Sequence, residues 1–370
     1  MAKYTGNPDY PHDKPACTGI LITNLGTTSA PTASAVRRYL SEFLSDPRVI
    51  ELAKPLWWLI LHGIILRTRP RRSAEAYAKI WTDEGSPLLQ ISKKQAVLIA
   101  ENLAERNKGP VHVELAMRYG QPSIASALEK LREARAQRLL VFPLYPQYSA
   151  TTSASTFDEV ARVLKGWRYI PELRMINHYH DDPAYISALS ESIREHWAKY
   201  GKPEKLLMSF HGLPRNYFLA GDPYYCECQK TARLLAQDLG LEDDLWDVSF
   251  QSRLGLQEWL KPYTDKLLKQ WAKSGIKNVQ LICPGFSADC LETLEEIKLQ
   301  NKGFFLEAGG EVFSYIPALN DQATHINALS DIVMQHTQGW PEFSDEYDKK
   351  TILDELASSK TRAIAQGANH

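Results

Sequence analysis

One histidine in this 370-residue chain lies where its side chain could take part in chemistry. His211 follows the apolar run 206–210 and precedes Gly212, so we expect its imidazole at the end of a strand. A neutral imidazole can accept a proton or bind a metal near pH 7. A histidine hydrogen-bonded within its own turn fits the same pattern equally well. The spacing alone leaves both interpretations open.

A second candidate is the acidic run that contains Asp289, Glu292, Glu295 and Glu296. If this run is helical, Glu292 and Glu296 lie one turn apart on one face, with Asp289 near Glu292. Such carboxylates could pass a hydrated divalent cation along, because hard cations prefer oxygen ligands. Acidic residues in a first helical turn also suit the helix dipole, whatever the function. Both interpretations stay open here too.

The third feature is an apolar segment, residues 56–66, which we call the apolar lip. It leads into Arg67, Arg69, Arg71 and Arg72. Aromatic residues beside arginines suit a membrane interface, or the rim of a pocket whose ligand ends in carboxylates. A buried core helix explains the apolar run but gives no reason for four arginines in six residues. We therefore favour a surface that meets a ligand or a membrane.

The composition excludes several other function classes. With 44% hydrophobic residues, 24% charged residues and a formal charge of -1, no bulk positive field invites nucleic acid. The lip is shorter than the ~20 residues that a spanning helix needs. Five scattered cysteines and the lack of a leader pattern favour a reducing cytoplasmic setting. Neither a G-x-G-x-x-G turn nor a phosphate-binding loop is present, which disfavours nucleotide chemistry.

Strand-like apolar runs alternate with amphipathic helical stretches from about residue 19 to 335, which predicts an α/β fold of parallel strands joined by helical crossovers. The expected strands are residues 19–25, 111–117, 138–143, 205–210, 246–250 and 279–284. The expected helices are residues 33–44, 74–80, 91–106, 124–134, 184–200, 228–239 and 256–275. Residues 311–337 are expected to add one more strand and helix.

The two halves of the chain follow a similar plan, since each opens with an apolar strand that runs into a glycine turn. We predict two similar doubly wound domains, residues 17–170 and 171–338, with a cleft between strand ends where open α/β sheets bind ligands. Residues 339–370 are polar, and we expect a loosely held tail.

Taken together, these segments resemble the ferrochelatase family. The matching motifs occur in the family's order and cover roughly residues 17–335: Gly-Ile-Leu-Ile-Thr-Asn-Leu-Gly at 19–26, Gly-Ser-Pro at 85–87, Tyr-Pro-Gln-Tyr-Ser at 145–149, Ser-Phe-His-Gly-Leu-Pro at 209–214, Gly-Asp-Pro-Tyr at 221–224, Phe-Gln-Ser-Arg-Leu-Gly at 250–255 and Asp-x-x-Glu-Thr-Leu at 289–294. The resemblance implies a lyase that inserts Fe²⁺ into protoporphyrin IX and releases two protons, the last step of haem synthesis.

The resemblance also implies the site residues. His211 and Glu292 match the pair that faces each other across the macrocycle, and we assign iron binding and proton handling to them jointly. Pocket-wall positions are matched by Leu25, Tyr77, Trp259 and Phe286. Polar positions near the site are matched by Arg118, Gln251, Ser252 and Asp289. Weaker candidates for binding the porphyrin propionates are Arg69, Arg72 and Ser86.

Further expectations concern partners and cofactors. The lip resembles that of enzymes using protoporphyrin more than those using coproporphyrin, and it implies peripheral contact with the inner face of the cell membrane. Some relatives bind a [2Fe-2S] cluster through C-terminal cysteines, but no cysteine follows Cys290, so no cluster or other cofactor is expected. Cys290 stands where some relatives have histidine. Cys226 and Cys228 are expected to be free thiols.

Two alternatives remain: a chelatase for another tetrapyrrole or metal, such as cobalt, and a non-catalytic tetrapyrrole carrier or sensor. Relatives that insert cobalt are usually shorter and lack the lip. A carrier needs a haem ligand but no proton acceptor, so the presence of both His211 and Glu292 argues against it.

Overall fold

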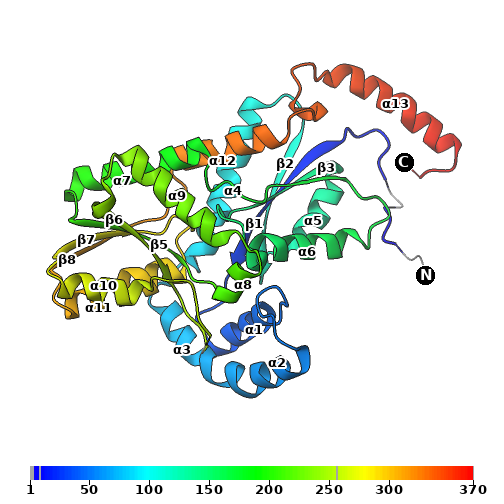
Figure 1. The fold of residues 1–370 in the computed structure, drawn as a ribbon. Helices are drawn as coiled ribbons and strands as arrows, with labels where there is room; N and C mark the ends of the chain where they lie inside the picture. Colours follow the sequence, from blue (N-terminus) through cyan, green and yellow to red (C-terminus); the bar gives the residue numbers. More distant parts are fainter. Residues whose placement is uncertain (1–3, 8–9, 256, 370) are drawn as a thin grey trace.

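The first half of the molecule contains a four-stranded parallel sheet (Figure 1). The computed structural model describes residues 4–7, 10–255 and 257–369. The strands β1 (Cys17–Gly26), β2 (Val111–Tyr119), β3 (Ala136–Pro143) and β4 (Glu172–Met175) lie in the order β2-β1-β3-β4. The first strand is therefore central and pairs with both β2 and β3.

The second half repeats this arrangement, as the sequence predicted. Its strands β5 (Lys205–His211), β6 (Trp246–Gln251), β7 (Asn278–Ile282) and β8 (Val312–Ile316) are also parallel, in the order β6-β5-β7-β8. In each sheet the strand order reverses beside the first strand. In open α/β sheets, ligands bind outside the carboxyl ends of the strands at such a point. These ends are where Leu25 and His211 lie.

Helices cover both faces of each sheet. In the first half they are α1 (Ala33–Leu44), α2 (Lys54–Ile60), the π-helix η1 (Leu61–Ile65), α3 (Leu66–Ala78), α4 (Pro87–Arg106), α5 (Ile124–Glu133), the π-helix η2 (Ala150–Ala154) and α6 (Ser155–Leu164). In the second half they are α7 (Pro183–Tyr200), α8 (Arg215–Leu219), α9 (Tyr224–Leu239), the 3₁₀-helix η3 (Asp243–Leu245), α10 (Thr264–Lys273), the π-helix η4 (Glu292–Asn301), α11 (Lys302–Glu307), α12 (Ala323–His336), the 3₁₀-helix η5 (Pro341–Phe343) and α13 (Lys349–Ala365).

One hydrophobic core joins the two halves. Alternate residues of a strand point to opposite faces of its sheet. Ile20 and Ile22 of β1 therefore enter the same core as Met208 of β5, together with residues of α4, α7, α9 and α12. Leu21 enters a separate cluster on the outer face of the first sheet, and Leu207 a third on the outer face of the second. Strands buried on both faces explain the continuous apolar runs in the sequence.

Two expectations about element boundaries need correction. The domain boundary near residue 171 lies before β4, which pairs with β3 in the first sheet, so the first half extends at least through Met175. This short edge strand reads Glu-Leu-Arg-Met and lacks an apolar run. The expected helix 256–275 is α10, which begins only at Thr264. Residues 252–255 and 257–263 are irregular, and residue 256 lies outside the described part of the chain.

The C-terminal segment is also better anchored than expected. Trp340 and Glu342 are buried, and Glu342 accepts hydrogen bonds from Arg138 of β3 and from the Thr18 hydroxyl of β1. Beyond them α13 lies on the same side of the molecule as the N-terminal segment (Figure 1), and Lys360 pairs with Asp13 at 2.6 Å. The polar composition predicted a loosely held tail and gave no sign of this attachment.

Candidate functional site

His211 is the last residue of β5, as predicted, and its side chain is half-buried. Its Nδ1 lies 2.7 Å from the carbonyl oxygen of Gly212. A carbonyl oxygen only accepts hydrogen bonds, so Nδ1 carries the proton. In the neutral ring this leaves the lone pair on Nε2 free to accept a proton or bind a metal. The turn thus sets the tautomer of the imidazole, and a histidine that is hydrogen-bonded within its own turn still has Nε2 available.

The turn after His211 is closely packed. A Cβ on Gly212 would lie 2.7 Å from the carbonyl oxygen of Gln251, a contact that only glycine avoids. Trp259 is buried beside this turn, pairs through its backbone with Pro214, and donates from Nε1 to the Leu254 carbonyl at 3.0 Å. Trp259, predicted as a pocket wall, therefore supports the segment that holds His211.

Glu292 is the first residue of η4, and its side chain is half-buried. In a π-helix the backbone hydrogen bonds run from i to i+5, and such segments are frequent at functional sites. The buried Gln251 amide donates to the Glu292 backbone carbonyl at 3.0 Å. The same amide accepts from the Ser209 hydroxyl at 2.8 Å. Gln251 therefore ties the start of η4 to β5, the strand that ends in His211.

Three neutral groups lie near the Glu292 carboxylate. The thiol of Cys290 donates to it, and burial together with the charge of Glu292 raises the pKa of that thiol. Burial and the same charge also raise the pKa values of the Tyr39 and Tyr77 phenols, although for Tyr39 the nearby Tyr77 contributes more than Glu292. Within the described part of the chain, neither Glu292 nor His211 has an ion-pair partner within 4.0 Å. A cation that arrives at Glu292 meets a carboxylate with no competing positive charge.

Glu296 lies on η4 within electrostatic range of both His211 and Glu292. Burial raises the pKa of this carboxyl, against the opposing effects of the Ser252 hydroxyl, the His211 charge and the Ser252 N–H, and the charge of Glu292 adds to the rise. Both the hydroxyl and the N–H of Ser252 donate to Glu296. Ser252 adopts a left-handed φ of 59° to do so, a strained backbone of the kind that clusters at functional sites.

The other two acidic residues of the run face elsewhere. Both oxygens of Asp289 accept hydrogen bonds, from Thr293 and Tyr315 on one side and from Asn320 on the other. Asp289 thus stabilises the loop before η4. Glu295 is buried and pairs with Lys79, the residue after α3, at 2.8 Å. This ion pair holds η4 against the first half.

Residues of the first half that the sequence proposed for the pocket gather around Thr27. The Thr27 hydroxyl accepts from Ser86 at 2.9 Å and also forms a hydrogen bond with Tyr77. Leu25, two residues earlier, is half-buried, as is Phe286 from the second half. Ser86 is buried at the start of α4. Its hydroxyl therefore has a partner within the protein.

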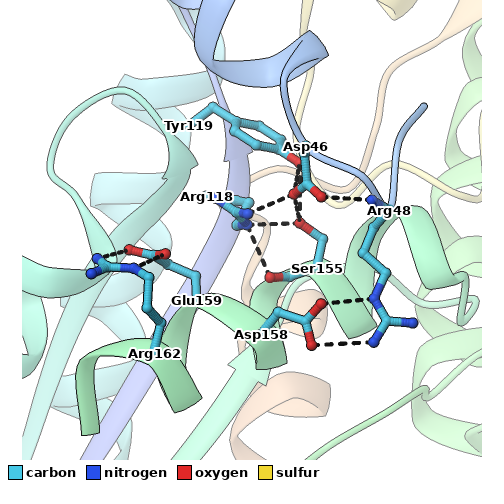
Figure 2. A network of polar contacts seen from close by, with 8 residues as sticks. All are labelled: Asp46, Arg48, Arg118, Tyr119, Ser155, Asp158, Glu159 and Arg162. Atoms are coloured by element: carbon cyan, nitrogen blue, oxygen red, sulfur yellow. Dashed lines mark hydrogen bonds and ion pairs between the residues drawn. The ribbon is translucent and has the colours of Figure 1, made fainter. Parts of the chain in front are cut away.

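Arg118 belongs to a buried polar network (Figure 2). Its Nη2 lies 2.5 Å from Asp46, and its Nε donates to the Ser155 hydroxyl at 2.7 Å. Tyr119 also donates to Asp46 at 2.8 Å. The network joins β2, the start of α6 and the turn after α1.

The apolar lip folds as α2 and η1 at one edge of the molecule (Figure 1). Its inner face packs through Leu61 and Trp57, whose Nε1 donates to the Leu44 carbonyl at 2.6 Å. On the outer face, Trp58 and Leu59 are 59% and 62% exposed. Arg67, Arg69, Arg71 and Arg72 are all exposed. Partial burial and the charge of Arg72 lower the pKa of Arg69, so these two cations lie close together.

Sequence reasoning missed two residues that the structure places around η4. Tyr39 donates to the Gly26 carbonyl at 3.1 Å and lies near Glu292. Lys79 reaches Glu295 across the two halves. Nothing in the local sequence distinguishes Tyr39 from any other buried aromatic of an amphipathic helix. The partner of Lys79 lies more than two hundred positions away.

Known proteins resemble this chain in both sequence and fold. A sequence model of the family Ferrochelatase matches residues 17–337. Curated ferrochelatases from Thioalkalivibrio sulfidiphilus and Nitrosococcus oceani are 55% and 56% identical over 366 and 365 residues, and each alignment covers 99% of both chains. Among solved structures, SirB from Bacillus subtilis with Fe³⁺ superposes with a TM-score of 0.54 at 13% identity, covering 89% of this chain and 100% of that one.

At 13% identity, the match to SirB shows only that the two chains share a fold. The family match and the identities above 50% go further, because they span nearly the whole chain and include the segments of His211 and Glu292. The chain belongs to the ferrochelatase family, the enzymes that catalyse the terminal step of haem biosynthesis.

Proposed function

We propose that this chain inserts Fe²⁺ into protoporphyrin IX, with His211 and Glu292 as the central pair. This assignment rests on the complementary states of the two side chains. His211 has a free lone pair on Nε2. The Glu292 carboxylate has no cationic partner among the described residues. A porphyrin must lose two N–H protons while the aquated iron sheds its waters, so the reaction needs a neutral base and an oxygen ligand.

The proposed route for the iron uses Glu292 and Glu296. Their side chains lie within electrostatic range of one another and of His211. Asp289 is left out of the route because Thr293, Tyr315 and Asn320 occupy its oxygens. The raised pKa of Glu296 favours the protonated form, so this carboxyl can hold a proton when no cation is bound.

The proposed porphyrin contacts are apolar. The half-buried Leu25 and Phe286 offer apolar surface from the two halves, and Trp259 and Tyr77 support them from behind. Tight apolar packing can hold the macrocycle out of plane and expose its nitrogens. Arg69 and Arg72, two neighbouring exposed cations on α3, are the proposed partners of the propionates.

The test is an anaerobic assay of protohaem formation from Fe²⁺ and protoporphyrin, with coproporphyrin in parallel. Loss of general acid–base or metal-binding groups costs about 10²–10⁴ in rate, so His211→Ala and Glu292→Gln should each lose most activity. His196→Ala and Glu307→Gln, which alter residues far along other elements, are the matched controls. Wild-type turnover in either site variant contradicts the assignment. Porphyrin binding without iron insertion in the wild type would instead favour a carrier, and preference for Co²⁺ a different chelatase.

We further propose that the lip contacts an anionic membrane surface. Its outer face exposes Leu56, Trp58, Leu59 and Ile64 beside a cluster of arginines, the combination that binds interfaces containing acidic lipids. None of the described helices is both long and apolar enough to cross a membrane. A peripheral contact gives the poorly soluble porphyrin a short path to the site.

Flotation with liposomes of phosphatidylcholine and phosphatidylglycerol tests the lip. The double variant Trp58→Ser, Leu59→Ser should float less than the wild type. The control is Leu245→Ser, Val312→Ser, which removes exposed apolar side chains from the second half. Equal flotation of the wild type and the lip variant refutes the membrane contact and leaves the chelation proposal untouched.

A further inference from the structure

Two histidines and one glutamate form a cluster apart from His211 and Glu292. His178 and His180 lie in the loop between β4 and α7, and Glu227 lies in the first turn of α9. One ligand atom of each residue lies within 4.8 Å of the corresponding atoms of the other two. His178 Nδ1 is 2.7 Å from one oxygen of Glu227, and His180 Nδ1 is 3.3 Å from the other.

One nitrogen in this cluster lacks a hydrogen-bond partner. His180 is only 5% exposed, and its Nδ1 is the atom aimed at Glu227, but no well-aligned hydrogen bond reaches it among the described residues. Leaving a buried polar atom unpaired costs about 1–3 kcal/mol. Native proteins tolerate this where a ligand or ion completes the arrangement. The unpaired nitrogen is therefore independent evidence that something besides protein belongs there.

The surroundings hold the three side chains in place. The Thr231 hydroxyl of α9 donates to the His180 backbone carbonyl at 2.8 Å, which fixes the loop to the helix. The backbone N–H of Tyr148 donates to Glu227 at 2.7 Å. Partners of this kind orient metal ligands in proteins. The Tyr148 contact comes from the first half and α9 from the second, so the cluster lies where the two halves meet.

The local charge and access also favour a cation. Lys230 forms an ion pair with Asp181 at 2.5 Å. The negative charge of Glu227 is therefore not neutralised by Lys230. The side chain of His178 is 50% exposed, while those of His180 and Glu227 are 6% and 9% exposed. Solvent thus reaches the cluster from one side only, which leaves an entry path and an open coordination position.

From these contacts we propose that His178, His180 and Glu227 bind a divalent transition-metal ion, at a site separate from the iron-insertion site. Two imidazoles and one carboxylate suit Zn²⁺, Fe²⁺ or Co²⁺, whereas Mg²⁺ and Ca²⁺ prefer oxygen ligands. Ligand bonds of about 2.0–2.2 Å require ligand atoms no more than ~4 Å apart. The ligand atoms already lie within 4.8 Å of one another, so metal binding requires only a small further approach.

Binding at this site links to the proposed chemistry through α9. Tyr224 lies one turn before Glu227 on the helix, and its phenol hydrogen-bonds to the backbone of His211. A metal that joins the loop before α7 to Glu227 fixes the start of α9, and with it the backbone support of His211. The ion acts as a clamp between elements rather than as a reactant.

Equilibrium dialysis of the chelator-treated full-length protein against Zn²⁺ measures the site directly. We expect His178→Ala and Glu227→Gln each to lose one equivalent of bound Zn²⁺, and His196→Ala, which alters another half-buried histidine, to lose none. His211→Ala should keep the same equivalent, which separates this site from the iron-insertion site. Zn²⁺ should also raise the unfolding temperature of the wild type more than that of His178→Ala.

The proposal is overturned if His178→Ala binds as many equivalents as the wild type. It is equally overturned if the equivalent disappears in His211→Ala but not in His178→Ala. Because Glu227 is buried, its variant alone could lose binding through misfolding, but His178 is half-exposed, so we expect its removal to leave the fold intact. Circular dichroism of each variant checks this.

Discussion

Arg118 and Asp46 form a nearly buried ion pair with 2.5 Å between Nη2 and Oδ2. The pair links the end of β2 to the turn after α1, just before the chain enters α2 and the apolar lip (Figure 2). Asp46 also accepts from the Ser155 hydroxyl at 2.6 Å and from the Arg48 N–H at 2.8 Å. This nearly buried ion pair therefore fixes the segment that leads into the lip.

Asp46→Asn should destabilise the protein by about 3–5 kcal/mol, the usual cost of removing one partner of a buried ion pair. Urea unfolding measures this loss. The matched control is Asp158→Asn, which breaks the exposed pair with Arg48 in the same network and should cost at most about 1 kcal/mol. Similar losses in the two variants would contradict the distinction between the buried and the exposed pair.

The effect of Asp46→Asn should depend on pH. Burial raises the pKa of Asp46, but the Ser155 hydroxyl, the Arg48 N–H, the Tyr119 hydroxyl and the Arg118 charge outweigh it, so the pKa lies below its ordinary value of 3.8. The stabilisation is thus complete above pH 3.8 and is lost as the pH falls through the lowered pKa. The difference in unfolding free energy between the wild type and Asp46→Asn should become smaller over that range. A difference that becomes larger in acid contradicts the lowered pKa of Asp46.

Gln251→Leu should lower the rate of iron insertion by about tenfold, since one lost hydrogen bond of about 1.4 kcal/mol corresponds to that factor. Gln251 is a positioning residue: it holds the start of η4 to β5 and touches neither carboxylate nor imidazole of the pair. The fall should appear in kcat, with KM for porphyrin little changed.

The control for this prediction is Gln280→Leu. Gln280 is equally buried, lies on β7 of the same sheet, and donates to the Gly201 carbonyl at 2.9 Å, remote from η4. Both variants should lose stability, but only Gln251→Leu should lose kcat. Equal kcat in the two variants means that the link to η4 has no role in catalysis.

Much of the fold could be predicted because buried parallel strands leave a clear pattern. The runs at β1, β3 and β5 are apolar on both faces, and the structure places strands there within two residues of the predicted ends. The strand β4 was not predicted, because a four-residue edge strand with half its side chains charged has no such pattern. Family motifs, not spacing, paired His211 with Glu292. The structure adds the tautomer of His211 and the neutral thiol of Cys290 beside Glu292.

The long-range pairs could not be predicted. Arg138 and Glu342 are both ordinary charged residues in the sequence, and only the fold brings them together, more than two hundred positions apart. The same holds for Lys79 with Glu295 and for the cluster of His178, His180 and Glu227. Local patterns report which residues are buried but not which polar groups meet.

Ending the chain after Gln338 should destabilise the protein by about 3–5 kcal/mol, because it removes Trp340 and leaves Arg138 without Glu342. Ending it after Asp348 removes α13 alone. No residue of α13 is buried, so this shorter truncation should cost little. Thermal unfolding of the two truncated proteins checks the prediction. If both lose the same stability, the anchor lies in α13 instead.

Gly109→Ala should also loosen the C-terminal segment. A Cβ at Gly109 would lie 2.5 Å from the Cα of Glu342, a backbone contact that cannot yield easily, and overpacking of this kind costs about 1–3 kcal/mol. Gly303→Ala in α11 is the control, since a Cβ there meets nothing within 4 Å. That variant should be neutral or slightly more stable. Limited proteolysis near residue 345 should increase in Gly109→Ala only.

The attachment of Glu342 has a consequence for how the protein forms during translation. The first sheet is complete in sequence at Met175, but the Arg138 side chain on β3 lacks its carboxylate until residue 342 has been made. At ~5–20 residues per second, that interval lasts on the order of ten seconds or more. Arg138 therefore remains without this partner during that interval, and a segment that is synthesised later secures a strand that was made earlier.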